Sequence, residues 1–266
     1  MNKILDIKNL CYTVRTKSLT GEIIDKNILD NISFDLQREK ILGIAGESGS
    51  GKTTLAKMLA GIIVQTSGTI SLNLANDWST ISTKPVQILF QNNGEILNPL
   101  REISSIIDEA IKIRFGKIEE DQRKRVLDSV QLNEKLRSRK GFELSGGEQQ
   151  RAALARILAV QPEVLILDEP FSAQDPVSQL NFLQLFKSIN QEYKISMICI
   201  SHNLKILRAL CDEIIILYRG KIVEEGETKN IFENPKHPYT KFLLKAEDYT
   251  LKYDEIQNEI ELLKEE

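Results

Sequence analysis

A glycine-rich stretch contains the first residues that could do chemistry. Residues 46 to 53 read Gly-Glu-Ser-Gly-Ser-Gly-Lys-Thr, which matches the pattern G-x-x-x-x-G-K-[ST]. The apolar run KILGIA precedes this stretch, and the helix-forming run KTTLAKMLAGI follows it. Glycines let successive backbone N–H groups turn toward phosphate oxygens, and a helix N-terminus adds a positive dipole. The stretch therefore predicts a loop that holds a nucleoside triphosphate.

Within this loop we expect different residue types to have different roles. Lys52 provides positive charge for the β- and γ-phosphates on an exposed side chain, and the hydroxyl of Thr53 can bind Mg²⁺. A glycine-rich turn without a ligand is the alternative, and the strand before it and helix after it argue against that. The residues predicted to bind nucleotide here are Gly46, Glu47, Ser48, Gly49, Ser50, Gly51, Lys52, Thr53 and Thr54.

Two adjacent carboxylates end a second apolar run. The sequence VLILDEP, residues 164 to 170, is typical of a buried parallel strand, and open α/β sheets bind ligands at such strand ends. Asp168 is placed to hold Mg²⁺, while Glu169 is placed to polarise a water in line with the γ-phosphate. An acidic helix cap is the alternative, and the phosphate loop upstream favours the catalytic interpretation.

A pair of glycines opens a third motif, LSGGEQQRAALARIL, residues 144 to 158. Ser145 and Glu148 have the spacing of a capping box at the start of a helix. That box does not explain Gly146 and Gly147, because each glycine in a helix costs about 1 kcal/mol relative to alanine. We expect an anion to approach the backbone there.

Composition excludes several classes of protein. The chain has 266 residues, of which 41% are hydrophobic and 27% charged, enough for one large core with a smaller lobe. Its net charge of −3 gives no field that favours nucleic acid or an anionic membrane surface. Three cysteines without metal-like spacing indicate a reducing compartment. No apolar run reaches the length of a transmembrane helix.

Periodicity predicts how the chain is organised. Residues 1 to 90 suggest strands, with a hairpin at RTKSLTGEIIDKN, and residues 91 to 159 suggest helices, for example SSIIDEAIKI and QRKRVLDSVQL. The core returns at 160 to 226, where EIIILYRGKIVEEG predicts two strands joined at Arg219-Gly220.

The order of the phosphate loop, LSGGEQQR, LILDEP and a later ISH resembles the ATP-binding subunits of ABC transporters, from about residue 4 to 245. The resemblance implies an α/β fold: a P-loop NTPase core of the ABC ATPase type with an antiparallel β subdomain and a helical lobe. The ATP-binding domain would span 1–245, with the lobe at about 91–159 and a C-terminal helical tail at 246–266.

The same resemblance implies roles for further residues. Gln91 would link the Mg²⁺ site to the helical lobe, and His202 in CISHNL would be the switch histidine, so the catalytic residues would be Glu169, His202 and Gln91. Two subunits would lie head to tail, with ATP between the phosphate loop of one and the LSGG helix of the other. Asp175 in SAQD would cross the dimer seam. The residues expected to meet the partner's ATP are Ser145, Gly146, Gly147 and Glu148.

Two positions depart from the family pattern. Val14 stands where an aromatic ring usually stacks on adenine, and Tyr12 lies two residues earlier on the same predicted strand face. Either the stacking is weak or a bulge brings Tyr12 into place. Gln174 replaces the usual leucine, which puts packing at the seam in doubt.

The C-terminal part points to a subfamily. GETKNIFENPKHPYTKFLL, residues 226 to 244, and LNPLREI, residues 97 to 103, resemble importers of oligopeptides, dipeptides and nickel. Many of those proteins have a cysteine-rich tail, which is missing here after Cys211, and this absence favours the metal importers. The ending YTLKYDEIQNEIELLKEE would gather apolar residues on one helix face, packed on its own domain or on a partner.

Together these features imply a peripheral ATPase subunit at the cytoplasmic face of a membrane, with ATP and Mg²⁺ as cofactors. Its partners would be a second ATPase subunit, two permeases that dock near Gln91 through Ile96, Leu97 and Leu100, and indirectly an external substrate-binding protein. Nucleic acid is not expected. The alternatives are a soluble ABC-type ATPase that acts on DNA or ribosomes, and a small-molecule P-loop kinase.

Overall fold

The structure, a computed structural model, describes residues 2–17, 21, 23–90, 97–172 and 174–247. The chain forms two units. The first unit joins residues 1–72 to the chain from residue 198 onward, and the second unit is the contiguous stretch 73–197. The phosphate loop and His202 therefore belong to the first unit, whereas Asp168, Glu169 and the LSGG motif belong to the second.

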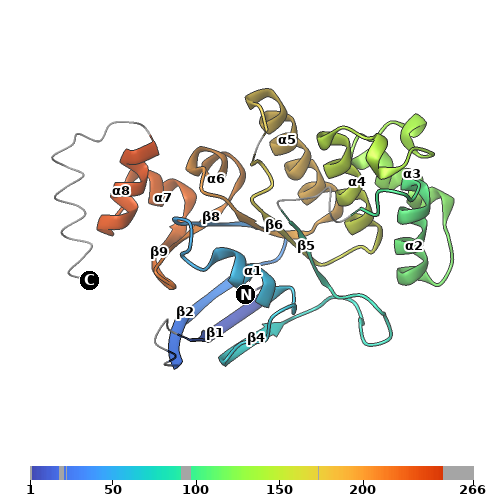
Figure 1. Ribbon diagram of the computed structural model, residues 1–266. Helices are drawn as coiled ribbons and strands as arrows, with labels where there is room; N and C mark the ends of the chain where they lie inside the picture. The colour runs from blue at the N-terminus through green and yellow to red at the C-terminus, as the bar shows by residue number, and fades with distance from the viewer. Residues whose placement is uncertain (1, 18–20, 22, 91–96, 173, 248–266) are drawn as a thin grey trace. The chain divides into compact units, whose positions relative to one another are not determined.

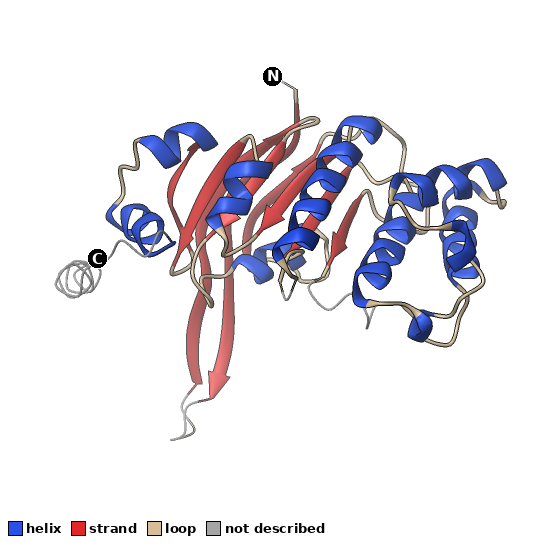
Figure 2. Ribbon diagram, turned by 90° about the horizontal axis from the view of Figure 1, so that it is seen from above, coloured by secondary structure: helices blue, strands red, loops and turns tan. Residues whose placement is uncertain are grey.

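A three-stranded antiparallel sheet begins the first unit. Its strands β1 (Lys3–Lys17), β2 (Ile23–Gln37) and β4 (Ser67–Leu72) lie in the order β2-β1-β4. β1 and β2 pair from Lys3↔Gln37 to Lys17↔Ile23, which confirms the predicted hairpin. β4 pairs with β1 no farther than Cys11, so the outer part of β1 and β2 is a two-stranded ribbon, visible in Figure 2.

The second sheet region of this unit carries the phosphate loop. β3 (Ile41–Ala45) is fully buried and runs parallel to β8 (Glu213–Tyr218), which pairs in antiparallel fashion with β9 (Lys221–Glu227). Arg219 and Gly220 join β8 to β9 as predicted, and both have positive φ, 46° and 80°, as a tight hairpin turn requires. The helices of this unit are α1 (Lys52–Leu59), α6 (Leu204–Leu210), α7 (Thr228–Glu233) and α8 (Pro238–Glu247) (Figure 1).

The described part of the second unit contains a parallel strand pair and four α-helices. β5 (Val86–Leu89) pairs with β6 (Val164–Asp168), and α5 (Pro176–Tyr193) follows. β7 (Ser196–Ile200) carries the chain from the second unit into the first. Glu163, just before β6, is 9% exposed and accepts hydrogen bonds from the backbone of Ala75 and Asn76 and from the indole of Trp78. This carboxylate fixes the connection that follows β4.

Three helices form a lobe within the second unit: α2 (Ile103–Phe115), α3 (Glu120–Ser129) and α4 (Gly146–Ala159). The helical pattern predicted for SSIIDEAIKI and QRKRVLDSVQL is confirmed by α2 and α3. Short 3-10 turns at Glu134–Leu136 and Gly141–Glu143 connect α3 to α4. Ile103, Ile107 and Ile111 recur at helical spacing and are buried at 1% exposure or less.

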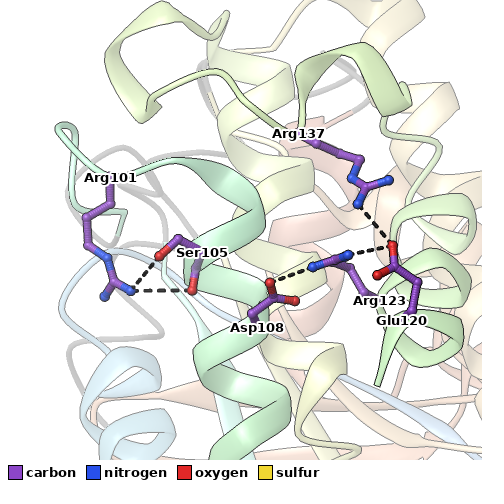
Figure 3. Close-up of polar contacts among 6 residues, drawn as sticks. All are labelled: Arg101, Ser105, Asp108, Glu120, Arg123 and Arg137. Atoms are coloured by element: carbon purple, nitrogen blue, oxygen red, sulfur yellow. Dashed lines mark hydrogen bonds and ion pairs between the residues drawn. The ribbon is translucent and has the colours of Figure 1, made fainter. Parts of the chain in front are cut away.

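An arginine forms ion pairs that connect α2 and α3 on the polar side of this lobe. The guanidinium of Arg123 on α3 contacts Asp108 on α2 at 2.5 Å and Glu120 at 2.5 Å (Figure 3). Arg137 reaches the same Glu120 carboxylate at 3.2 Å. The arginine is largely covered, so this pair of contacts is screened less by solvent than an exposed ion pair would be.

The three cysteines of the chain form no disulfide bond. All three are free; Cys199 and Cys211 are buried, and Cys11 is half-buried. Within the described parts of the chain, no helix has the combination of length and apolar character needed to cross a bilayer.

Candidate functional site

The phosphate loop lies between the end of β3 and the start of α1, and two of its glycines have no tolerable substitute. Gly46 has φ 153°, and a Cβ there would lie 2.1 Å from the carbonyl oxygen of Leu217. Gly51 has φ 106°, and a Cβ there would lie 2.7 Å from Leu29. These contacts leave no space for a side chain, so the loop path requires glycine at both positions.

Lys52 is the first residue of α1, and the structure corrects the expectation that it is exposed. Its exposed fraction is 8%, and its Nζ donates hydrogen bonds of 2.8 Å to the carbonyls of Gly46 and Glu47. The reason is that the first helical turn lies directly against the loop. The ammonium therefore sits among the loop's own peptide groups.

The rest of the loop offers hydroxyl groups and exposed backbone. Ser48, Gly49 and Thr53 are exposed, and Thr54 is half-buried. Ser50 is 1% exposed, and its Oγ is a buried polar atom without a hydrogen-bond partner. A buried unpaired hydroxyl, a buried ammonium and the N-terminus of an eight-residue helix suit a polyphosphate anion. The residues present fit ATP.

The aromatic position on β1 lies beside a bulge in the neighbouring strand. Tyr12 and Val14 are both half-buried on β1. Tyr12 pairs with Leu29 and the next residue pairs with Asn27, so the extra residue, Ile28, belongs to β2. This bulge therefore does not by itself move Tyr12 relative to Val14 on β1. Adenine stacking by Tyr12 stays a prediction.

The two carboxylates at the end of β6 have different backbone conformations. Asp168 is the last residue of the strand and is 4% exposed. Glu169 has φ 51°, in the left-handed region that residues with side chains rarely adopt. The N–H and hydroxyl of Ser172 hold this turn by donating to the Glu169 carbonyl at 3.2 and 2.9 Å. The turn therefore begins at Glu169, so the two carboxylates leave the backbone in different ways, which agrees with separate roles for them.

The LSGG helix begins with the predicted capping box. The N–H and the hydroxyl of Ser145 each donate to the Glu148 carboxylate at 2.8 Å, and the Glu148 N–H donates back to Ser145 Oγ at 3.4 Å. The bond from the Ser145 N–H is the main cause that lowers the pKa of Glu148. Gly146 and Gly147 are exposed, and a Cβ on either would meet no atom within 4 Å. Nothing in this unit requires glycine there.

Gln174, the residue that departs from the family pattern, binds within its own unit. Its amide donates to Gln150 Oε1 on α4 and, at 3.3 Å, to the carbonyl of Pro170. Gln150 is 4% exposed and donates to the same Pro170 carbonyl at 2.7 Å. Two amides thus connect the LSGG helix to the turn after Glu169. The sequence did not reveal this connection, because the two glutamines lie 24 positions apart.

Asp175 is the N-cap of α5. Its carboxylate accepts bonds from the N–H groups of Val177 and Ser178 at 3.0 and 3.1 Å, and the Ser178 hydroxyl is the main cause that lowers the pKa of Asp175. This local role accounts for the aspartate by itself. Its place at a dimer seam stays a prediction.

His202 is exposed just after β7. The N–H of the preceding Ser201 donates to the carbonyl of Ile44 on β3 at 3.3 Å, so His202 follows a residue bonded to the strand that leads into the phosphate loop. Gln91 and Ile96 lie outside the described residues, as does the predicted C-terminal helix beyond residue 247. Their roles stay predictions.

The predicted docking residues divide between core and surface. Leu97 is 2% exposed, so its predicted role as a surface contact is wrong, because a buried side chain offers no area to a permease. Leu100 is 72% exposed. Phe142 is 61% exposed, and its N–H donates to the carbonyl of Pro99 at 3.3 Å, which places it beside Leu100 in the chain's fold. Sequence reasoning missed Phe142.

Comparison with known families gives two matches. Residues 29–172 match the family described as ABC transporter, and residues 223–256 match the family described as oligopeptide/dipeptide transporter, C-terminal region.

Curated relatives and solved structures agree with these matches. The dipeptide transport ATP-binding protein DppF of Haemophilus influenzae is 39% identical over 244 residues, covering 88% of this chain and 74% of that protein. A putative peptide import ATP-binding protein of Brucella ovis is 34% identical over 253 residues, covering 91% and 78%. The structure of cbiO1 from Clostridium perfringens, part of an ABC transporter complex, has a TM-score of 0.73 at 25% identity and covers 88% of this chain and 92% of that one. A dimeric ATP-binding cassette bound to ADP and Pi has a TM-score of 0.71 at 25% identity and covers 85% and 99%.

Proposed function

Because this chain belongs to the ATP-binding proteins of the ABC transporter family and is an ATPase, we propose that it powers the import of short peptides. The observation that carries the proposal is the match of residues 223–256 to the C-terminal region of oligopeptide/dipeptide transporters. The relatives named above are dipeptide or peptide transport proteins, which favours peptides over the metal complexes suggested by the missing cysteine tail. These relatives also favour transport over action on DNA or ribosomes.

The chemistry proposed is hydrolysis of ATP to ADP and phosphate. Lys52 and the backbone of the phosphate loop bind the phosphates, and Glu169 accepts a proton from the attacking water. Bound Mg²⁺ would neutralise charge that develops between the β- and γ-phosphates. The residues that would hold Mg²⁺ are Thr53, Asp168 and Gln91, partly through water. His202 would contact the γ-phosphate and sense its loss.

The second ATPase subunit is proposed to complete each site. The capping box leaves the start of α4 stable without any ligand, and the exposed backbone of Gly146 and Gly147 is accessible to a γ-phosphate held by the partner. Either an identical or a homologous subunit could supply that phosphate. Two subunits in head-to-tail arrangement would then enclose two ATP molecules.

A permease pair is the proposed membrane partner, with an external protein delivering the peptide. Leu100 and Phe142 offer exposed apolar surface on the helical unit. Next to them, Arg101 is held by hydrogen bonds to the Ser105 carbonyl and hydroxyl at 3.3 and 3.1 Å, which Figure 3 shows. The guanidinium of Arg101 also forms an ion pair with Glu109, so the exposed apolar pair is the feature that suits docking of a permease helix. Docked in this way, the subunit would lie at the cytoplasmic face of the membrane.

Glu169→Gln tests the hydrolysis and dimer steps together. The variant keeps the side chain's shape but removes the base, so we expect ATP binding to survive and turnover to fall at least a hundredfold. ATP held between two subunits should then give a dimer in size-exclusion chromatography. Lys52→Ala is the matched control, which should neither bind ATP nor dimerise. Turnover at the wild-type rate in Glu169→Gln would remove Glu169 from catalysis.

The peptide assignment needs a separate measurement. The complex with its permeases, reconstituted in vesicles with the external binding protein, should hydrolyse ATP faster when di- and tripeptides are added. Nickel chelates serve as the comparison. Stimulation by the chelates and not by peptides would contradict the peptide proposal while leaving the ATPase assignment intact.

A further inference from the structure

A tyrosine near the end of the described chain contacts the phosphate loop. The N–H of Glu47 donates a hydrogen bond of 2.9 Å to the hydroxyl of Tyr239, although 192 positions separate them in the sequence. Glu47 is the second residue of the loop, and its carbonyl accepts the Lys52 ammonium at 2.8 Å. Both peptide groups of Glu47 are therefore fixed, one by Tyr239 and the other by Lys52.

The ring of Tyr239 is held as firmly as its hydroxyl. Its exposed fraction is 1%, and it stacks on Tyr218, the last residue of β8, with ring centroids 4.1 Å apart and planes inclined at 31°. Burial raises the pKa of Tyr239 to about 12, so the hydroxyl stays protonated at neutral pH. It can therefore accept the Glu47 N–H as a neutral group.

The segment that leads into α8 is anchored to β9. The Glu224 carboxylate accepts the N–H groups of Lys236 and His237 at 2.8 and 3.0 Å. Nδ1 of His237 in turn accepts the Tyr239 N–H at 3.1 Å, which satisfies a donor in the first turn of α8. These bonds set where the hydroxyl of Tyr239 lies relative to the loop.

We propose that Tyr239 is a positioning residue for nucleotide binding, and that it couples helix α8 to the occupancy of the phosphate loop. The inference rests on the proposed function, since it requires the loop to bind ATP. Without the hydroxyl, the Glu47 N–H would lose its acceptor and the start of the loop would shift to find another. ATP binding would then have to restore the loop, which weakens the apparent affinity. Because coupling is reciprocal, ATP should in turn stabilise α8.

The test compares two tyrosine-to-phenylalanine variants. Tyr239→Phe keeps the ring stacked on Tyr218 and removes the hydroxyl. Tyr193→Phe is the matched control, because its hydroxyl bonds to Ser129 Oγ at 2.9 Å in the other unit. We expect Tyr239→Phe to raise the KM for ATP about tenfold, equivalent to about 1.4 kcal/mol, with kcat changed less than twofold. Tyr193→Phe should leave the KM unchanged.

Hydrogen exchange gives a second reading of the same coupling. ATP should slow amide exchange across residues 238–247 in the wild type and in Tyr193→Phe, and not in Tyr239→Phe. A merely structural loss would change the exchange of α8 equally with and without ATP. If Tyr239→Phe matches Tyr193→Phe in both KM and exchange, the inference is wrong while the proposed function stands. If the wild type itself fails to bind ATP, both are wrong.

A second variant keeps the inference testable if Tyr239→Phe folds poorly. Glu224→Gln loosens the approach to α8 without touching Tyr239, the loop or the stacked rings. We expect Glu224→Gln to raise the KM for ATP twofold to fourfold, which is a smaller rise than in Tyr239→Phe. A Glu224→Gln protein with wild-type KM and wild-type protection of α8 by ATP would contradict the coupling.

Discussion

The phosphate loop and the start of the LSGG helix are both rich in glycine, but the physical reasons for glycine differ between the two sites. In the phosphate loop, Gly46 and Gly51 have positive φ and lie against backbone and side-chain atoms of their own unit. At the LSGG helix, a Cβ on Gly146 or Gly147 would meet no atom within 4 Å. The first pair is required by the fold of the chain. No contact among the described residues requires the second pair, which supports the proposal that a partner's ATP approaches it.

The same contrast extends to the polar groups around each site. Glu47 and Ser50 of the phosphate loop bond to residues far away in the sequence, Tyr239 and Gly220. Ser145 and Glu148 bond to each other. The phosphate loop is therefore built by its whole unit, whereas the LSGG helix start is locally complete and stays exposed. This independence agrees with the proposal that the LSGG helix start meets the ATP of a partner subunit.

The largest effect is expected from Gly46→Ala. A Cβ 2.1 Å from the Leu217 carbonyl forces the backbone apart, and we expect a loss of more than about 3 kcal/mol in the free energy of unfolding, with ATP binding abolished. Urea denaturation followed by circular dichroism measures it. Gly49→Ala is the control, because Gly49 also has positive φ, 85°, but no atom within 4 Å, so it should lose about 1 kcal/mol. Equal losses of stability in Gly46→Ala and Gly49→Ala would contradict the view that contacts within the unit require glycine at position 46.

Gly147→Ala should separate stability from activity. In the free subunit the new methyl group enters open space within a helix, so stability should stay equal or rise by about 1 kcal/mol. In the assembled transporter, ATPase activity should fall at least tenfold, because the methyl group comes between the backbone and the partner's phosphate. Thermal unfolding and steady-state ATPase assays measure the two effects. A destabilised subunit would mean that the glycine serves its own fold after all.

Substitutions at Ser145 separate its role as a helix cap from its proposed contact with the partner's ATP. Aspartate can cap a helix as serine does, but here it would lose the hydroxyl that donates to the Glu148 carboxylate at 2.8 Å and place a second carboxylate beside it. Ser145→Asp and Ser145→Ala should therefore each cost the free subunit about 1 kcal/mol. In the assembled transporter the two variants should differ, because the carboxylate of Ser145→Asp also repels the partner's γ-phosphate. Full ATPase activity in Ser145→Asp would support a purely capping role for Ser145.

The smallest effect concerns pH. The folded protein lowers the pKa of Glu148, so its contribution to stability is present above the ordinary glutamate range and is lost as the pH falls through the lowered value. Glu148→Gln should therefore show less loss of stability on acidification than the wild type, by a small margin because the carboxylate is half-exposed. Melting temperatures across an acid titration measure the difference. An unchanged profile would mean that the box contributes nothing through charge.

The sequence predicted features that depend on neighbouring residues, and it missed features that depend on contacts between distant residues. The capping box and the Arg219-Gly220 turn were readable because each depends on neighbours within a few positions. The burial of Lys52 could not be predicted from the sequence, since it depends on how the phosphate loop folds back on the helix. The bond from Glu47 to Tyr239 joins positions too far apart for any periodicity to connect them. The amide pair Gln150 and Gln174 falls in the same class.

The first unit is assembled from both ends of the chain, and this has a consequence for the order in which the protein is made. The ribosome completes the contiguous unit 73–197 while β3 still lacks its parallel neighbour β8. Until Asp212 emerges to accept the N–H of Ile41, 171 positions earlier, a fully apolar strand is left without its partner. During synthesis there is therefore an interval in which all residues of the second unit are present. In that interval the first unit cannot yet form, and the apolar strand β3 has to be covered by some other surface.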